Sequence, residues 1–270
     1  LHQTLEKMAT GKRVRFASDD PHASAELMRL YENVQRIDAR KGSISRSRAW
    51  MELTEQAVDE VGNILSTGQQ LSIRAASETL RQSQLDAIAE QVDGLRQQLQ
   101  GVANYSVSGS YIFSGTMTDT EPYDNAGVYQ GNDQHVEIPI DQGTLQLNLT
   151  GREVFGEAGG GGAIDLLQEF EDALRAGDAD ALQTFTGRFR EAVNGNSSKL
   201  AKIGTMRRQL EDADIRLDER RLESQERIAD LGAVDMAKAI SDAERLETSY
   251  QSTLAAGARL FGPTFFDYLG

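Results

Sequence analysis

Apolar residues recur at helical spacing through the first third of the chain. Ser18, Asp19, Asp20 and Pro21 form a helix start signal, because side-chain oxygens can accept the unpaired amides of a first turn and proline suits that turn. Beyond them, apolar residues follow at steps of three, four or multiples of seven: Leu27, Leu30, Val34, Ile37, Ile44, Met51, Val58, Val61 and Leu65. Lys41 and Arg48 interrupt this stripe. It predicts one helix continuing to Ala76, about 80 Å long at ~1.5 Å per residue, and hence an elongated molecule.

Further helices are expected after this first one. A break over residues 77–83 and a second helix over 84–107 would fold back on the first helix. Residues 163–176 and 178–193 read as two shorter helices separated by Gly177. Asn194, Gly195 and Asn196 predict another break, after which a second long helix starts at Ser197 and runs to about Leu260. The first and last thirds of the chain are therefore expected to pack together.

Residues 116–162 differ from the rest in composition. They hold eight acidic residues and one basic residue, a segment charge of −7, together with nine glycines and two prolines. A long helix is excluded there, and apolar residues alternate with period two over 135–140 and 144–149. Residues 141–143 would form the turn between these two strands. The fold class predicted is mainly α with a small β insertion (α+β): an elongated antiparallel helical bundle or coiled-coil rod with a β-rich outer domain.

Composition narrows the possible functions. The 270 residues carry a net charge of −14, no cysteine and three histidines, so thiolate chemistry and zinc–thiolate sites are excluded and nucleic acid is a poor partner. No stretch approaches the ~20 apolar residues of a membrane span, and the N-terminus lacks the apolar core of a signal peptide. Because the first residue is Leu1, we expect an N-terminal piece to be missing.

The candidate chemical motifs fail when their spacing is tested. Gly11-Lys12-Arg13 lacks the earlier glycine and the following hydroxyl of a phosphate loop, and is read as a basic link between two helices. The glycines at 159–162 lack dinucleotide-binding spacing, and the acidic insert lacks a calcium-loop pattern. No Ser-His-Asp arrangement is indicated. We therefore expect no enzyme activity, no metal and no cofactor.

Three regions, in order along most of the chain, resemble the bacterial flagellin family: residues 10–21, residues 111–123, and the C-terminal runs 250–254 and 265–269. Residues 10–21, Thr-Gly-Lys-Arg-Val-Arg-Phe-Ala-Ser-Asp-Asp-Pro, resemble its N-terminal signature. The segment 111–123, with Phe-Ser-Gly-Thr at 113–116, and the ending Phe265-Phe-Asp-Tyr-Leu269 are similar to hook-associated members of that family at the hook–filament junction. The run 250–254, Tyr-Gln-Ser-Thr-Leu, is similar to the same members.

This resemblance implies a structural, extracellular subunit of the flagellum, exported without a cleaved signal peptide. The expected partners are further copies of the chain in a ring, the hook-side hook-associated protein, flagellin and a flagellar export chaperone, with neither nucleic acid nor membrane. The residues that match family assembly segments are interfacial rather than catalytic: Arg13, Asp19, Asp20, Pro21, Phe113, Ser114, Gly115, Leu254, Phe265 and Leu269.

The resemblance also suggests a domain plan. Residues 1–18 would be the end of a truncated N-terminal coiled-coil segment with its linker, and 19–115 the N-terminal helices of a rod domain. Residues 116–162 would form the outer domain, 163–234 the C-terminal helices of the rod, and 235–270 a C-terminal coiled-coil and assembly segment. The alternatives are a filament flagellin, a cytoplasmic coiled-coil signalling scaffold, and an enzyme with its site in the β insert.

Overall fold

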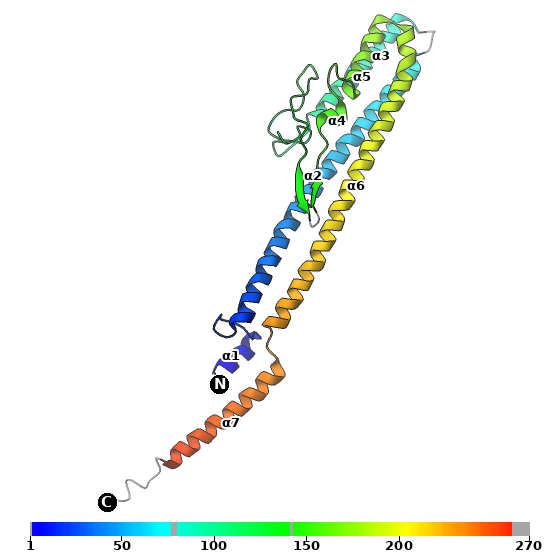
Figure 1. The fold of residues 1–270 in the computed structure, drawn as a ribbon. Coiled ribbons are helices and arrows are strands. Elements are labelled where there is room, and N and C mark those ends of the chain that lie inside the picture. Colours follow the sequence, from blue (N-terminus) through cyan, green and yellow to red (C-terminus); the bar gives the residue numbers. More distant parts are fainter. Residues whose placement is uncertain (1, 77–79, 141–142, 261–270) are drawn as a thin grey trace, which may run out of the picture. The chain divides into compact units, whose positions relative to one another are not determined.

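The computed structural model describes residues 2–76, 80–140 and 143–260, and it is mainly α with a small β insertion, as predicted. The described chain forms two compact units: a terminal unit of residues 1–40 and 216–270, and a central unit of residues 41–215. The elements, shown in Figure 1, are α1 (His2–Thr10), α2 (Pro21–Ala75), α3 (Gln82–Ala103), β1 (Ser106–Val107), β2 (Ser110–Tyr111), β3 (Glu137–Ile140), β4 (Gly143–Gln146), α4 (Gly151–Phe155), α5 (Ala163–Ala176), α6 (Ala179–Gly232) and α7 (Met236–Leu260).

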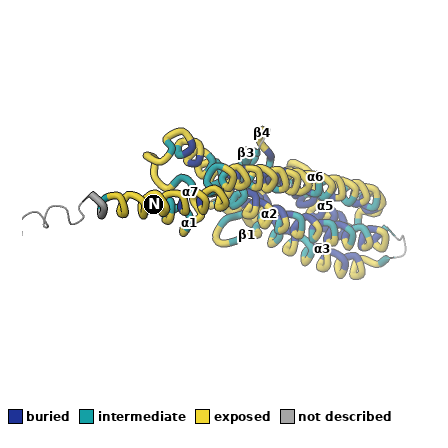
Figure 2. Tube along the Cα trace, turned by 90° about the horizontal axis from the view of Figure 1, so that it is seen from below, coloured by how far each residue is buried: buried dark blue, intermediate teal, exposed yellow. Residues whose placement is uncertain are grey.

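In the central unit, α2 and α6 are antiparallel neighbours and α3 packs against α5. Gly62 and Gly68 on α2 allow close approach of α6, because an added Cβ would lie 2.9 Å from the Asn196 amide nitrogen and 2.5 Å from the Phe189 ring. Buried apolar residues line α2, α3 and α5, which Figure 2 shows as dark blue faces. Removal of these apolar side chains from water is the main source of stability for this unit.

The polar residues that interrupt the apolar stripe of α2 have a partner on α6. Lys41 Nζ lies 3.3 Å from Asp214 Oδ1, and an Arg48 guanidinium nitrogen lies 3.4 Å from Asp214 Oδ2. One carboxylate therefore serves both cations, and α2 continues as a helix past them.

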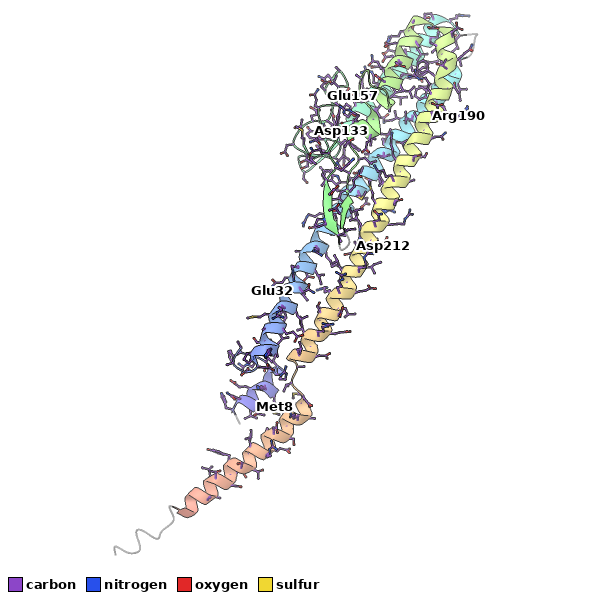
Figure 3. The ribbon with its side chains drawn as sticks, in the orientation of Figure 1. Met8, Glu32, Asp133, Glu157, Arg190 and Asp212 are labelled. Carbon is purple, nitrogen blue, oxygen red and sulfur yellow. The ribbon has the colours of Figure 1, made fainter. Side chains whose placement is uncertain are left out.

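The residues between α3 and α5 form a small region with its own aromatic core. Two antiparallel hairpins, β1–β2 and β3–β4, occur here, the second pairing Ile138 with Leu145. Phe113 and Phe155 meet edge to face with ring centroids 4.8 Å apart, and Tyr123 lies against Phe155. At the surface, Arg152 forms ion pairs with Asp133 and Glu157, which are both labelled in Figure 3. The two predicted strands are thus confirmed with shorter bounds, since β3 begins at Glu137 and β4 ends at Gln146. Of the expected turn at 141–143, Gly143 instead begins β4, and residues 141–142 lie outside the described residues.

Three predicted elements are confirmed and several boundaries were wrong. The first long helix ends at Ala75, and α5 spans 163–176. The predicted 84–107 helix corresponds to α3, which ends at Ala103, so that Ser106–Val107 form β1 instead. Of the expected break at 77–83, residues 77–79 lie outside the described residues and α3 already begins at Gln82. However, α6 passes through residues 194–196 without a break, because Asn196 is 2% exposed and donates its side-chain amide to the Val58 carbonyl at 2.8 Å. The expected helix from Ser197 to Leu260 is instead divided between Gly232 and Met236, where Asp235 caps α7 by accepting the Lys238 amide at 3.0 Å.

Candidate assembly interface

In the terminal unit, the link between α1 and α2 is joined to the end of α6 by backbone hydrogen bonds. The Arg13 amide donates to the Gly232 carbonyl at 2.7 Å, and the Val234 amide donates to the Gly11 carbonyl at 3.0 Å. Lys12 and Ala233 form an antiparallel bridge between them. The last carbonyls of α6, which have no partner within the helix, are thereby partly satisfied by the link.

The Arg13 side chain strengthens this junction. Its Nε and Nη2 donate to the Leu231 carbonyl at 3.1 and 2.9 Å, and its Nη1 donates to Asp20 Oδ2 at 2.9 Å. The guanidinium therefore lies at the negative C-terminal end of the α6 dipole, while the Asp20 carboxylate lies at the positive N-terminal end of α2. Through one ion pair and two hydrogen bonds, the Arg13 side chain connects two helix ends that are more than 200 positions apart in the sequence.

Asp19 and Asp20 organise the backbone around the start of α2, and Asp20 accepts a first-turn amide as the helix start signal predicted. Asp20 Oδ1 accepts the Ala23 amide at 3.0 Å, and Asp19 Oδ2 accepts the amides of Arg15 and Phe16 at 3.0 and 3.1 Å. These hydrogen bonds favour the charged carboxylates and lower both pKa values from their ordinary range. For Asp20 the Ala23 amide contributes most and Arg13 comes next.

Beside this link lies a groove of about 870 Å³, which we call the linker groove. Three large side chains in its lining are exposed: Phe16 from the link, and Met28 and Tyr31 from one face of α2. Lys12 and Arg15 also line the groove, and Arg15 forms an ion pair with Glu6. Clustered large apolar side chains at the surface are typical of protein–protein contact sites.

The central unit contains a second group of the predicted interface residues, and they are buried. Phe113, Ser114 and Gly115 lie in the small aromatic region, where the Ser114 hydroxyl donates to the Thr120 carbonyl at 2.5 Å. Gly115 has a positive φ of 70°, and a Cβ there would collide with the Asn132 backbone. These three residues therefore shape the region from inside, and a role in assembly would be indirect.

The C-terminal predicted residues fall on and beyond α7. Leu254 is 55% exposed on α7, while Phe265 and Leu269 lie outside the described residues. Four more large apolar side chains are exposed on the same helix, namely Met236, Ile240, Leu246 and Tyr250. The contact of α7 with α1 buries Ala239 and Ala243 near its start.

Sequence reasoning missed the linker groove, whereas the contact between α1 and α7 agrees with the expected packing of the terminal segments. The exposed residues of the groove come from two elements, so no single periodicity marks them, although Met28 and Tyr31 stand three apart and hence on one helix face. Within the described residues, no three His, Cys, Asp or Glu side chains gather as a metal ion would need, and no described helix has a stretch apolar and long enough to cross a bilayer. The candidate contact surfaces among the described residues are therefore the linker groove and the exposed side chains of α7.

Comparison with known proteins adds independent information. Residues 1–118 match the bacterial flagellin N-terminal helical region. Flagellar hook-associated protein 3 of Escherichia coli K12 is 26% identical over 290 residues, covering 97% of this chain and 90% of that protein. The protein of the same name from Salmonella typhimurium is 31% identical over 157 residues, covering 56% of this chain and 48% of its own.

Solved structures agree on the fold. Hook-associated protein 3 from Legionella pneumophila has a TM-score of 0.67 at 14% identity, covering 75% of this chain and 98% of that one. Flagellins match a smaller share of their own length, as for the flagellin of Salmonella choleraesuis, 23% identical with 37% of its length covered. The chain is a homologue of flagellar hook-associated protein 3, and its first 118 residues are similar to the flagellin N-terminal helical region.

Proposed function

We propose that this chain is a structural subunit of the bacterial flagellum that joins the hook-associated ring to the flagellin filament by protein–protein packing. The observation that carries the proposal is the match to hook-associated protein 3 over 97% of the chain and 90% of the relative. It is supported by the terminal unit, where the linker groove and α7 leave large apolar side chains exposed to solvent. An exposed apolar surface of this extent needs a partner.

The proposed partners follow from this role. Copies of the chain would associate side by side in a ring, with the hook-side hook-associated protein on one side and the first flagellins on the other. A flagellar export chaperone would bind the chain before export, and the assembled protein would lie outside the cell. Since the chain has no cysteine, each contact must be stabilised without disulfides, which requires extensive non-covalent interfaces.

No chemical step belongs to this proposal, because the chain would act by connecting two assemblies of different subunits. The second candidate function is that of a filament flagellin. It has less support, because the chain covers 37% or less of the length of the matched flagellins. No specific feature of the described residues favours a signalling scaffold or an enzyme with its site in the β insert.

Complementation tests the proposal directly. The full gene would be expressed in a motile bacterium that lacks its own junction protein, and filaments would be scored by electron microscopy alongside the flagellin shed into the medium. Restored filaments and reduced shedding are expected. Bare hooks with continued shedding, despite confirmed export in a matched host, would reject the role.

Two substitutions locate the function within the chain. Leu254→Asp and Leu269→Asp place a charge on the proposed assembly segment; Leu254 is exposed on α7, and Leu269 lies outside the described residues. Both should weaken assembly without lowering the amount of folded protein. Normal filaments that resist shear in strains carrying either change would count against this segment as an assembly surface.

A further inference from the structure

The outer face of α6 in the terminal unit carries an exposed apolar residue in an acidic setting. Leu222 is 57% exposed, and it stands two positions before buried Ser224, so it points away from the line of α6 that meets α2. Glu219 and Glu226 lie one turn to either side of Leu222 on the same helix face, and both are exposed. We call Leu222 with these two glutamates the α6 ridge.

The linker groove has the opposite character. Its exposed centre is apolar, formed by Phe16, Met28 and Tyr31, and its charged lining residues are both basic, Lys12 and Arg15. An apolar hollow beside positive charges complements an apolar knob between negative charges. In a chain with a net charge of −14, such local complementarity is needed to offset repulsion between copies.

We propose that the α6 ridge of one copy docks in the linker groove of a second copy, with Leu222 inserted beside Met28 and Tyr31 and with Glu219 and Glu226 facing Lys12 and Arg15. This inference rests on the proposed self-association and names its surfaces. The two surfaces are different patches of one chain, so the contact is head to tail and can repeat from copy to copy around a closed ring. Burial of the apolar side chains supplies affinity, and the charges fix the orientation.

A cysteine pair tests the contact in the full chain, which contains no cysteine of its own. One variant carries Met28→Cys and another carries Leu222→Cys, and the two are co-expressed in the complemented strain and oxidised in assembled flagella. A mixed disulfide between the two variants is expected, in at least about tenfold excess over disulfides within either variant alone. A disulfide joining two Met28→Cys copies without the mixed product would overturn the head-to-tail contact.

Charge exchange provides a second readout. Lys12→Glu alone and Glu226→Lys alone each oppose like charges across the contact, and each should reduce assembly by about threefold, because exposed pairs are individually weak. Co-expression should restore assembly, since every groove of one variant then meets a ridge of opposite charge on the other. Absence of rescue, with both variants folded and exported, would contradict the pairing.

The apolar part is tested by Leu222→Asp, which should lower the number of filaments by about tenfold or more. Ile73→Asp is the matched control, because Ile73 is 58% exposed on α2 in the central unit, and it should leave filament number unchanged. If wild-type copies restore filaments but Leu222→Asp does so equally well and no mixed disulfide forms, the docking is wrong while the proposed function stands. A crosslink from Met28→Cys to another flagellar protein instead would assign the groove to that partner. If the wild-type gene restores nothing, the proposed function itself fails.

Discussion

The two units of the molecule use apolar residues in opposite ways. The central unit contains all of the largest fully buried side chains found among the described residues, including Phe113, Phe155 and Phe189. The terminal unit buries fewer apolar residues among the described ones, namely Ala23, Leu27, Ile37, Leu217, Ala239 and Ala243. Most of the large apolar residues that are exposed to solvent in the described chain belong to this unit. A unit with a deep core can fold by its own packing, whereas a unit with a thin core and an apolar surface gains stability by association.

Hydrogen bonds show the same contrast. In the central unit, polar side chains fill gaps in an apolar core, as Asn196 does between α2 and α6. In the terminal unit, Arg13 and Asp20 join helix ends at the surface, where water competes for their hydrogen bonds. Under the proposed function, the central unit would act as a stable support and the terminal unit would present the contact surfaces.

The largest expected effect comes from removing an aromatic ring from the central core. Phe155 is fully buried and packs against Phe113 and Tyr123, so Phe155→Ala should lower the free energy of unfolding by about 3–5 kcal/mol. Denaturant unfolding followed by circular dichroism measures this change. Val128→Ala, at a residue 42% exposed, is the control and should change stability little. Equal effects at both sites would contradict a core-stabilised central unit.

Alkaline pH should weaken the central unit. Burial raises the pKa of Tyr129 to about 12 and raises that of Tyr123 as well, while both phenols would ionise near pH 10 in the unfolded chain. Above about pH 10 the unfolded state binds fewer protons than the folded state, so stability falls as pH rises. Thermal unfolding from pH 8 to 11 measures the slope, and Tyr129→Phe should reduce it. A slope unchanged by that substitution would exclude Tyr129 as its source.

Acid should weaken the terminal unit first. The lowered pKa values of Asp19 and Asp20 mean that their contribution is present above the ordinary aspartate value and is lost as pH falls through the lowered values, below about pH 4. Hydrogen exchange should then show loss of protection at the amides of Phe16 and Ala23, which these carboxylates accept. Asp20→Asn should remove part of the pH dependence. Simultaneous loss of protection in α3 and α5 would indicate that the two units do not differ in this respect.

The smallest expected effect tests the unbroken course of α6. Gly195 is helical with no atom within 4 Å of an added Cβ, so Gly195→Ala should raise stability by about 0.5–1 kcal/mol. Gly62→Ala is the opposing control. Its new Cβ would lie 2.9 Å from the Asn196 amide nitrogen, so this substitution should lower stability. Thermal denaturation of both variants decides the point. A loss of stability with Gly195→Ala would mean that this residue is not in a regular helix.

Much of the fold could be predicted from local sequence. The first helix was predicted from the apolar stripe of α2 and the start signal at Asp20 and Pro21. Helix α5 was predicted from its helical spacing and from Gly177 at its end. The passage of α6 through Asn196 could not be predicted, because the hydrogen bond that satisfies this residue comes from the Val58 backbone of another helix. The hairpin of β1 and β2 has strands of two residues, which are too short to show a period.

The candidate interface also contains features that the sequence predicted and features that it could not predict. The capping role of Asp20 followed from residue type and position before a helix, whereas the bonds from Asp19 to the preceding amides of Arg15 and Phe16 did not. The partner of Arg13 could not be found from sequence, because it is a backbone carbonyl at residue 231 and carries no side-chain signature. The burial of Phe113 and Ser114 could not be predicted either, because a motif shared with relatives does not distinguish a core residue from a surface residue.

Hydrogen exchange with mass spectrometry, comparing the free protein with the protein in assembled flagella, tests the central claim most directly. The account predicts that assembly adds protection in the terminal unit, at the linker groove, the α6 ridge and α7, and leaves the cores of α3 and α5 as protected as before. Protection gained mainly in the central unit, with the terminal unit unchanged, would contradict it.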